Sequence, residues 1–185
     1  IYLIFFFCFN QDVSNLPSTL KYLIFGKNFN QNVSRLPSGL THLVFGDDFN
    51  QDISKLPISI TYLMLGKNFN QKCEFHPNIK YLELNCNNLH IINSLPNSVA
   101  GLKLNYYFNL ELNNLPTSIK KLVIDKYSIY DMDLNCLPNF IEELHLNRYY
   151  EKRILHIPPN LKKLVCHENY LYINDFVMYD IEMYQ

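Results

Sequence analysis

Two consecutive stretches decide the fold: residues 21–40 read KYLIFGKNFNQNVSRLPSGL, and residues 41–60 read THLVFGDDFNQDISKLPISI. Placed one above the other, they share Leu at the third position, Phe-Gly at the fifth and sixth, Phe-Asn-Gln at the ninth to eleventh, and Leu-Pro at the sixteenth and seventeenth. Such a match at a fixed spacing is typical of a tandem repeat. The sequence therefore predicts a structural unit that recurs every 20 residues.

Proline carries this period through the whole chain. It recurs at intervals of 19 to 22 residues, at Pro17, Pro37, Pro57, Pro77, Pro96, Pro116, Pro138 and Pro158. Proline fixes φ and lacks an N–H, so it must lie outside the hydrogen-bonded ladder of a sheet. We expect it on the connecting, convex side of each unit, where a short connection leaves room only for loops or 3₁₀ pieces.

After each proline comes L-x-x-L-x-L or a close variant, the strand half of a leucine-rich repeat. Its alternate leucines point to one face of a strand and the residues between them to the other. One short strand cannot bury its apolar face alone, so the turns must stack into a parallel sheet. The predicted strand centres are Leu3, Leu23, Leu43, Leu63, Leu82, Leu102, Leu122, Leu144 and Leu164.

The fold class predicted by these columns is a leucine-rich-repeat-like solenoid, with one short parallel β-strand per ~20-residue turn. It covers residues 1–171 in about nine turns, the first of them incomplete, and residues 172–185 are expected to be a C-terminal tail or cap. The apolar stretch Ile1 to Phe9 is too short for a membrane helix and aligns with the strand that begins the 21–40 unit. Because the chain starts in mid-repeat, we expect more sequence upstream.

Two repeated columns have a predicted structural role. Phe9, Phe29, Phe49 and Phe69 share one register and should form an inward aromatic spine. The asparagines that follow them, Asn10, Asn30, Asn50 and Asn70, can form a side-chain ladder that satisfies backbone groups of neighbouring turns. Asn28, Asp48 and Asn68 are rival candidates for that ladder, and the sequence does not decide between the two columns.

Composition excludes several classes of function. The formal net charge is -1, with 16 Lys+Arg against 17 Asp+Glu, which disfavours a nucleic-acid binder. Five cysteines without a CxxC pair indicate reduced thiols, and we expect a cytoplasmic protein not bound to a membrane. The six histidines lack metal-ligand spacing, and phosphate loops and nucleophile motifs are missing. The sequence therefore predicts no cofactor, no metal site and no catalytic residues, and an enzyme is the least favoured alternative.

The segment from Gly26 to Pro37, repeated from Gly46 to Pro57, has the form Gly-x-x-Phe-Asn-Gln-x-(Val/Ile)-Ser-x-Leu-Pro. It resembles the FNIP repeat, a short relative of the leucine-rich repeat found in proteins of social amoebae and of giant viruses that infect amoebae. The resemblance is tight over residues 1–72 and looser over 73–171. Many viral members resemble F-box proteins at their N-terminus, which implies that they are substrate adaptors of ubiquitin ligases.

The outward strand positions form the predicted binding face, because nothing but the tail is left to cover them. In the N-terminal half these positions are aromatic or aliphatic, and contiguous exposed apolar surface usually marks an interaction site. The candidate partner-binding residues are Tyr22, His42, Tyr62, Tyr81, Ile24, Val44 and Met64. We therefore expect a module that binds a protein partner on its concave face. The alternatives are self-association, through this face or the N-terminal edge, and a truncated or decayed repeat protein without a partner.

Overall fold

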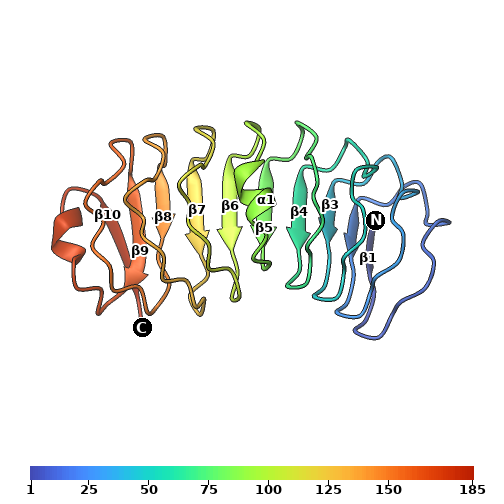
Figure 1. Ribbon diagram of the computed structural model, residues 1–185, viewed down its shortest axis with the longest axis horizontal. Helices are drawn as coiled ribbons and strands as arrows, with labels where there is room; N and C mark the ends of the chain where they lie inside the picture. The colour runs from blue at the N-terminus through green and yellow to red at the C-terminus, as the bar shows by residue number, and fades with distance from the viewer.

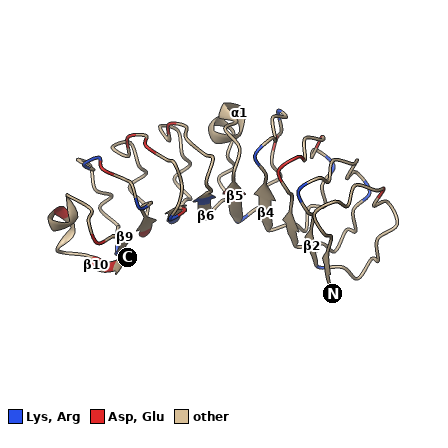
Figure 2. Cartoon of the chain, turned by 90° about the horizontal axis from the view of Figure 1, so that it is seen from below, with Lys and Arg blue, Asp and Glu red and all other residues tan.

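The computed structural model describes all residues from Ile1 to Gln185 as one arched solenoid, with the strands along the inner side of the arch (Figures 1 and 2). Ten parallel strands form a single sheet in the order in which they occur in the sequence. They are β1 (Tyr2–Ile4), β2 (Tyr22–Ile24), β3 (His42–Val44), β4 (Tyr62–Leu65), β5 (Tyr81–Leu84), β6 (Gly101–Leu104), β7 (Lys121–Ile124), β8 (Glu143–His145), β9 (Lys163–His167) and β10 (Asp180–Tyr184). The predicted fold class is confirmed.

The leucines that were predicted to centre the strands lie in one continuous register across the sheet. Leu23 pairs with Leu43 and Leu43 with Leu63, and the same column continues to Leu164 and then to Ile181 in β10. These side chains point to the inside of the solenoid, where Leu23, Leu43 and Leu63 are fully buried. The alternation of the sequence thus gives every turn one apolar face, and stacking buries those faces as one core.

Most connections on the convex side are loops and turns, and the exceptions are two short helices. Helix α1 (Leu89–Asn93) lies on the convex side after β5, and the 3₁₀ helix η1 (Ile173–Phe176) lies between β9 and β10. The segment 172–185, expected as a tail or cap, thus forms η1 and β10 and adds a strand to the sheet. Neither helix has the length and apolar character needed to cross a membrane.

The predicted aromatic spine is present in the first four turns. Consecutive rings of Phe9, Phe29, Phe49 and Phe69 stack with centroids 6.1 Å apart. In the first three turns a second ring from the end of the strand stacks on the spine, for example Phe25 on Phe29 at 3.7 Å. The spine ends where Asn88 takes the position of phenylalanine. Asn88 is buried, caps the start of α1 through the N–H of His90, and donates its side-chain amide to the carbonyl of Gln71.

The structure decides between the two asparagine columns. The Oδ1 atom of Asn30 accepts a hydrogen bond of 2.9 Å from the N–H of Asn50 and another of 2.9 Å from the side-chain amide of Gln51. Asn10 and Asn50 make the same pair of contacts to the turn that follows each of them. In the rival column a single side-chain bond joins Asn68 to Asp48. The asparagine of Phe-Asn-Gln is therefore the ladder.

A glycine column sets how closely the first turns can stack. A Cβ atom on Gly46 would lie 2.3 Å from the carbonyl oxygen of Gly26, and a Cβ on Gly66 would lie 2.1 Å from that of Gly46. Gly26 meets the carbonyl of Phe6 in the same way, at 2.4 Å. The obstructing atoms belong to the backbone of the preceding turn, so they cannot move aside without separating the turns. Glycine is required here by space, because none of these residues has a positive φ.

We predict that Gly46→Ala destabilises the solenoid, because the added methyl group must push two stacked turns apart. Overpacking of this kind costs about 2 kcal/mol, which should lower the midpoint of thermal unfolding, measured by circular dichroism, by roughly 4–8 °C. Gly39→Ala is the matched control, because a Cβ there first meets the flexible end of Lys21 at 3.1 Å. Equal melting temperatures for the two variants would contradict the steric role of Gly46.

A second prediction concerns the ladder. Asn30→Ala removes one acceptor and leaves two donors of the next turn unpaired, which should cost about 2 kcal/mol of unfolding free energy in urea titrations. Asn28→Ala, in the rival column, is the control and should change stability by less than about 0.5 kcal/mol. A larger loss for Asn28→Ala than for Asn30→Ala would show that the ladder is not the stabilising column.

Candidate binding surface

The candidate surface is the concave face of the sheet, where two columns of outward side chains run parallel to the solenoid axis. All seven predicted binding residues lie there, on β2 to β5. The first column pairs Tyr22, His42, Tyr62 and Tyr81 in register, and the second pairs Ile24, Val44 and Met64. Tyr81 and Ile24 are exposed and the other five are half-buried, so the structure brings these side chains together on one open face.

The first column is a ladder of stacked rings. The ring centroids of Tyr2 and Tyr22 are 4.0 Å apart, those of Tyr22 and His42 are 4.2 Å apart, and those of His42 and Tyr62 are 5.5 Å apart. All three pairs lie within 25° of parallel. The rings stack because parallel strands in register bring equivalent positions of successive turns side by side. The ladder presents the rims of its rings to solvent as a continuous aromatic strip.

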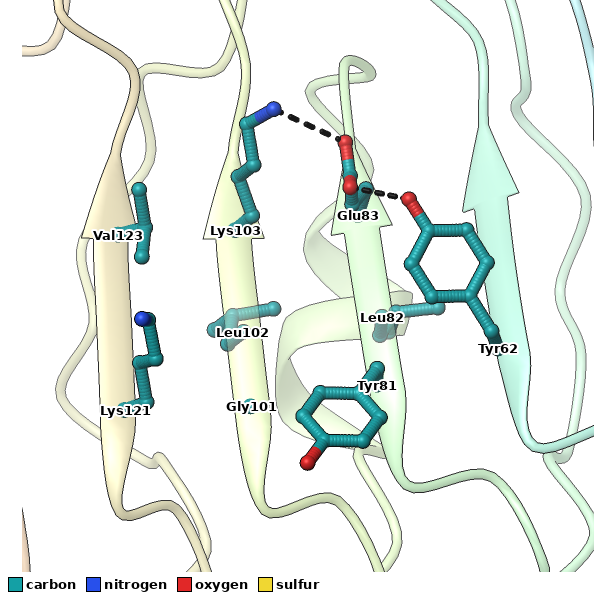
Figure 3. A pocket seen from close by; sticks show the side chains of 9 residues that line it. All are labelled: Tyr62, Tyr81, Leu82, Glu83, Gly101, Leu102, Lys103, Lys121 and Val123. Carbon is teal, nitrogen blue, oxygen red and sulfur yellow. Dashed lines mark hydrogen bonds and ion pairs between the residues drawn. The ribbon is translucent and has the colours of Figure 1, made fainter.

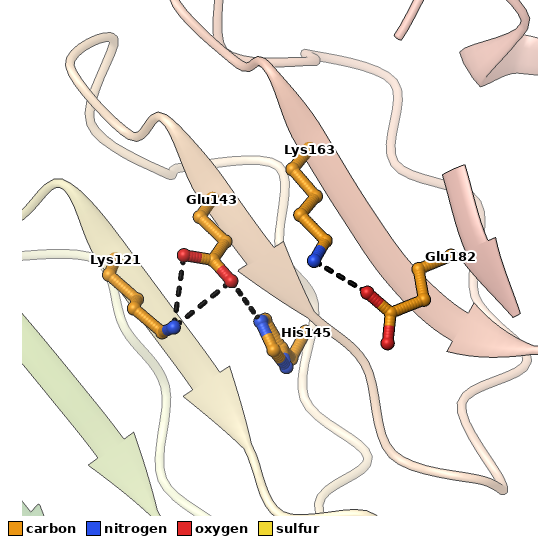
Figure 4. A network of polar contacts seen from close by, with 5 residues as sticks. All are labelled: Lys121, Glu143, His145, Lys163 and Glu182. Carbon is orange, nitrogen blue, oxygen red and sulfur yellow. Dashed lines mark hydrogen bonds and ion pairs between the residues drawn. The ribbon is translucent and has the colours of Figure 1, made fainter. Parts of the chain in front are cut away.

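The C-terminal half of the same face is charged. Glu143 accepts from Lys121 at 3.0 Å and contacts His145 at 2.6 Å, and Lys163 contacts Glu182 at 2.5 Å (Figure 4). Burial acts to raise the pKa of Glu143, but the hydrogen bonds from His145 and Lys121 together outweigh it and hold that pKa below its ordinary value. The charges on this half thus neutralise one another across neighbouring strands.

The aromatic and charged halves meet at Gly101, where the ring column loses its side chain. Here the face is hollowed to a volume of about 320 Å³. The ring of Tyr81 extends toward Gly101. Lys121 stands on β7 at the far side of the hollow, whereas Lys103 of β6 reaches back to Glu83 (Figure 3). The lining side chains are Tyr62, Tyr81, Glu83, Lys103, Lys121 and Val123, with the strand backbone at Gly101 and Leu102.

Four of these lining residues, Glu83, Lys103, Lys121 and Val123, were not among the predicted binding residues. The sequence does carry a signal for the hollow, because a column that reads Tyr, Tyr, His, Tyr, Tyr is followed by Gly101. That signal is a missing side chain rather than a motif. Only the structure shows that the hollow lies between the rings of Tyr62 and Tyr81 and the side chains of β6 and β7 (Figure 3).

Metal-binding and thiol chemistry have little basis in this structure. No three His, Cys, Asp or Glu side chains are grouped so that they could hold a metal ion. All five cysteines are free; Cys86 and Cys166 are buried, and burial raises the pKa of Cys86 to about 12. Such a thiol stays protonated at neutral pH and behaves as a small apolar side chain.

His76 is an anomaly on the convex side. It takes the place of the leucine that precedes proline in most turns, and neither of its buried ring nitrogens has a hydrogen-bond partner within the protein. Burial lowers the pKa of His76, and the nearby Pro57 carbonyl offsets only part of that effect. His76 lines a small crevice with Leu56 and Glu74 and is a weak point of the core rather than a ligand.

The family model for the FNIP repeat matches residues 33–56 and 69–107. These two segments of the chain match the FNIP repeat. The matched segments include β3 and span β5 and β6, so they cover part of the ring ladder and the hollow at Gly101. The columns of the FNIP repeat are therefore the structural columns described above: the inward leucines and phenylalanines, the asparagine ladder and the proline turns.

Among solved structures, the chain is similar to one described as the crystal structure of CroV588, a novel circular leucine-rich-repeat protein. The two share 33% sequence identity with a TM-score of 0.74, and the similarity covers 91% of this chain. It covers 27% of the CroV588 chain, so this chain spans about a quarter of that protein's length. A search of curated proteins found no significant match. Solenoids of this type generally serve as protein-interaction modules.

We predict that His76→Leu stabilises the protein, and more so in acid. The unfolded chain takes up a proton on this histidine near its ordinary pKa of about 6.5, whereas the folded chain resists protonation. The contribution of His76 to stability therefore falls as the pH drops below about 6.5. Removing two unpaired polar atoms should add about 1–2 kcal/mol at neutral pH. The added stability should be larger in urea titrations near pH 5.5 than near pH 7.5.

Burial also lowers the pKa of His42. Because His42 is present in both the parent chain and His76→Leu, its effect on the pH dependence of stability cancels in the comparison. A gain that is the same at both pH values would show that His76 is not the group whose protonation weakens the fold.

Proposed function

We propose that the chain is a protein-interaction module that binds its partner on the concave face, over the surface formed by Tyr22, His42, Tyr62, Tyr81, Ile24, Val44 and Met64. The observation that supports this most directly is the exposed ring ladder beside an aliphatic column. Ile24 is 36% exposed and Tyr81 is 54% exposed, on a sheet face that no other segment covers. Contiguous apolar surface of this kind is typical of interaction sites, and tyrosine is enriched among the residues that dominate binding energy.

The fold favours an extended partner over a compact one. A solenoid presents side chains from many turns along one inner face, and that face suits a segment that runs across several strands. The apolar half would supply most of the binding energy, and the paired charges of β7 to β10 would form a polar border. The surface is thus arranged as a hydrophobic strip with a charged end, as in the centre and rim of many interfaces.

The resemblance to viral and amoebal repeat proteins implies a narrower role, substrate recognition for a ubiquitin ligase. That role needs a separate segment that engages the ligase, in addition to the concave face. Self-association through the same face is the main alternative within the interaction class. The identity of the molecule bound to the concave face distinguishes these two roles. It is a ligase substrate in the first and a second copy of the chain in the second.

The test is to immobilise the protein and quantify what it retains from an amoebal lysate, in parallel with Val44→Arg and Ile58→Arg. Val44 points away from the core, so an arginine there should leave the melting temperature unchanged but place a charge in the middle of the apolar strip. We expect Val44→Arg to reduce partner retention by at least about 10-fold, the loss of one well-packed contact. Ile58→Arg is the matched control, because Ile58 is 72% exposed on the connecting side.

If both variants retain the same proteins as the parent chain, the partner binds elsewhere. If Val44→Arg unfolds, the assignment of this side chain to the concave face is wrong. Ligase subunits among the retained proteins would support the adaptor role. A shift from dimer to monomer on sedimentation of Val44→Arg would instead show self-association through this face.

A further inference from the structure

We infer that the hollow at Gly101 receives one aromatic side chain of the bound partner. This inference rests on the proposed function, because it assumes that the concave face is the binding face. It adds the chemistry of the contact and its place on the face, at the junction of β5, β6 and β7. Three observations on the lining side chains support it.

The first observation is that the ring ladder breaks off at this point. Tyr2, Tyr22, His42 and Tyr62 stack in register, and the next ring, Tyr81, extends instead over Gly101. A Cβ atom at Gly101 would lie 2.6 Å from Cδ1 of Tyr81, so the glycine is what allows this ring position. The ring column thus has no side chain of its own at position 101. The ring of Tyr81 covers Gly101 itself, so a ring supplied by a partner would enter the hollow beside Tyr81 and Tyr62.

The second observation concerns charge. Glu83 accepts hydrogen bonds from the hydroxyl of Tyr62 and the side-chain amide of Asn105, and pairs with Lys103 at 3.3 Å. Lys121 is held by Glu143 at 3.0 Å. Each charged group around the hollow therefore already has a counter-ion. A charged side chain entering the hollow would lose its water without gaining an unpaired partner, which disfavours it.

The third observation is the shape and polarity of the lining. Two phenol rings, Val123 and the backbone over Leu82 and Leu102 form apolar walls around about 320 Å³, which holds a ring. The ammonium group of Lys103 points back to Glu83 and that of Lys121 is held by Glu143, so the binding preference comes from the rings and not from these cations. An aliphatic side chain would gain only the apolar contact. The stacking surfaces of Tyr62 and Tyr81 therefore favour an aromatic occupant over an aliphatic one.

The experiment uses single amino-acid probes on the full chain, so it needs no identified partner. The ¹⁵N-labelled protein is titrated with N-acetyl-phenylalaninamide and with N-acetyl-leucinamide while the backbone amide of Gly101 is followed by NMR. We expect saturable shifts at Gly101, with an affinity about 5-fold higher for the phenylalanine probe, the preference that an aromatic pair provides. Gly101→Ala should reduce that affinity at least about 5-fold, because the new methyl group displaces the ring of Tyr81.

Gly39→Ala is the matched control: it adds the same methyl group at a half-buried turn before β3, away from the hollow, and should bind the probe like the parent chain. Tyr81→Leu keeps apolar bulk but removes the ring, and should abolish the preference for phenylalanine. Equal affinity for the two probes, shifts that avoid Gly101, or binding unchanged in Gly101→Ala would overturn the inference. Broadening of the backbone amide at position 101 that grows with protein concentration in the parent chain but not in Gly101→Ala would show a second copy in the hollow and overturn the assignment to a separate partner.

The inference about the hollow and the proposed function can fail independently of each other. If Val44→Arg loses partner retention while the Gly101 signal of the parent chain does not shift with the phenylalanine probe, the concave face is still the binding face. Only the inferred aromatic contact is then wrong. Probe binding at Gly101 together with partner retention by Val44→Arg would instead support the hollow and contradict the wider surface.

Discussion

Every feature of this solenoid depends on the main-chain contact between one turn and the next. The N–H of Thr41 donates to the carbonyl of Lys21 at 2.9 Å, and the N–H of Thr61 donates to that of Thr41 at 2.9 Å, so each turn is built on the backbone of the last. The glycine column exists because the turns approach closely enough to exclude a Cβ atom. The asparagine ladder exists because the same approach brings an unpaired N–H within reach of the preceding side chain. Close stacking therefore dictates which residues can repeat.

The same constraint creates the concave face. Strands held in parallel register place equivalent positions side by side, so a residue type repeated in the sequence becomes a continuous stripe in space. On the side of the strands that faces the core, this produces the column of buried leucines, which solvent does not reach. On the concave side it produces the ring ladder from Tyr2 to Tyr62, which solvent does reach. The repeat that stabilises the fold thus also concentrates aromatic surface on the concave face. Exposed surface of this kind is typical of interaction sites.

The sequence predicted the parts of this structure that recur, because seven proline intervals and nine leucine positions independently indicate the same 20-residue turn. It did not resolve the asparagine column, since both candidates have the period and only the direction of the side chains distinguishes Asn30 from Asn28. It also did not show β10, because Asp180–Tyr184 lacks the proline and leucine columns and joins the sheet through backbone pairing with β9. Helix α1 was hidden for a similar reason: it depends on the single change from phenylalanine to Asn88, which caps it.

The departures from the repeat are therefore the more informative positions for specificity. A uniform ladder offers a bound segment several equivalent registers, each shifted by one turn, and gives no reason to prefer one of them. The break at Gly101 is different, because it occurs once along the face and is bordered by rings toward the N-terminus and by ion pairs toward the C-terminus. A partner that inserts a ring there has a single register, with its apolar residues over β2 to β5 and its polar residues over β7 to β10. In the proposed complex the repeats would supply the contact area, and the one irregular turn would set the register of the partner.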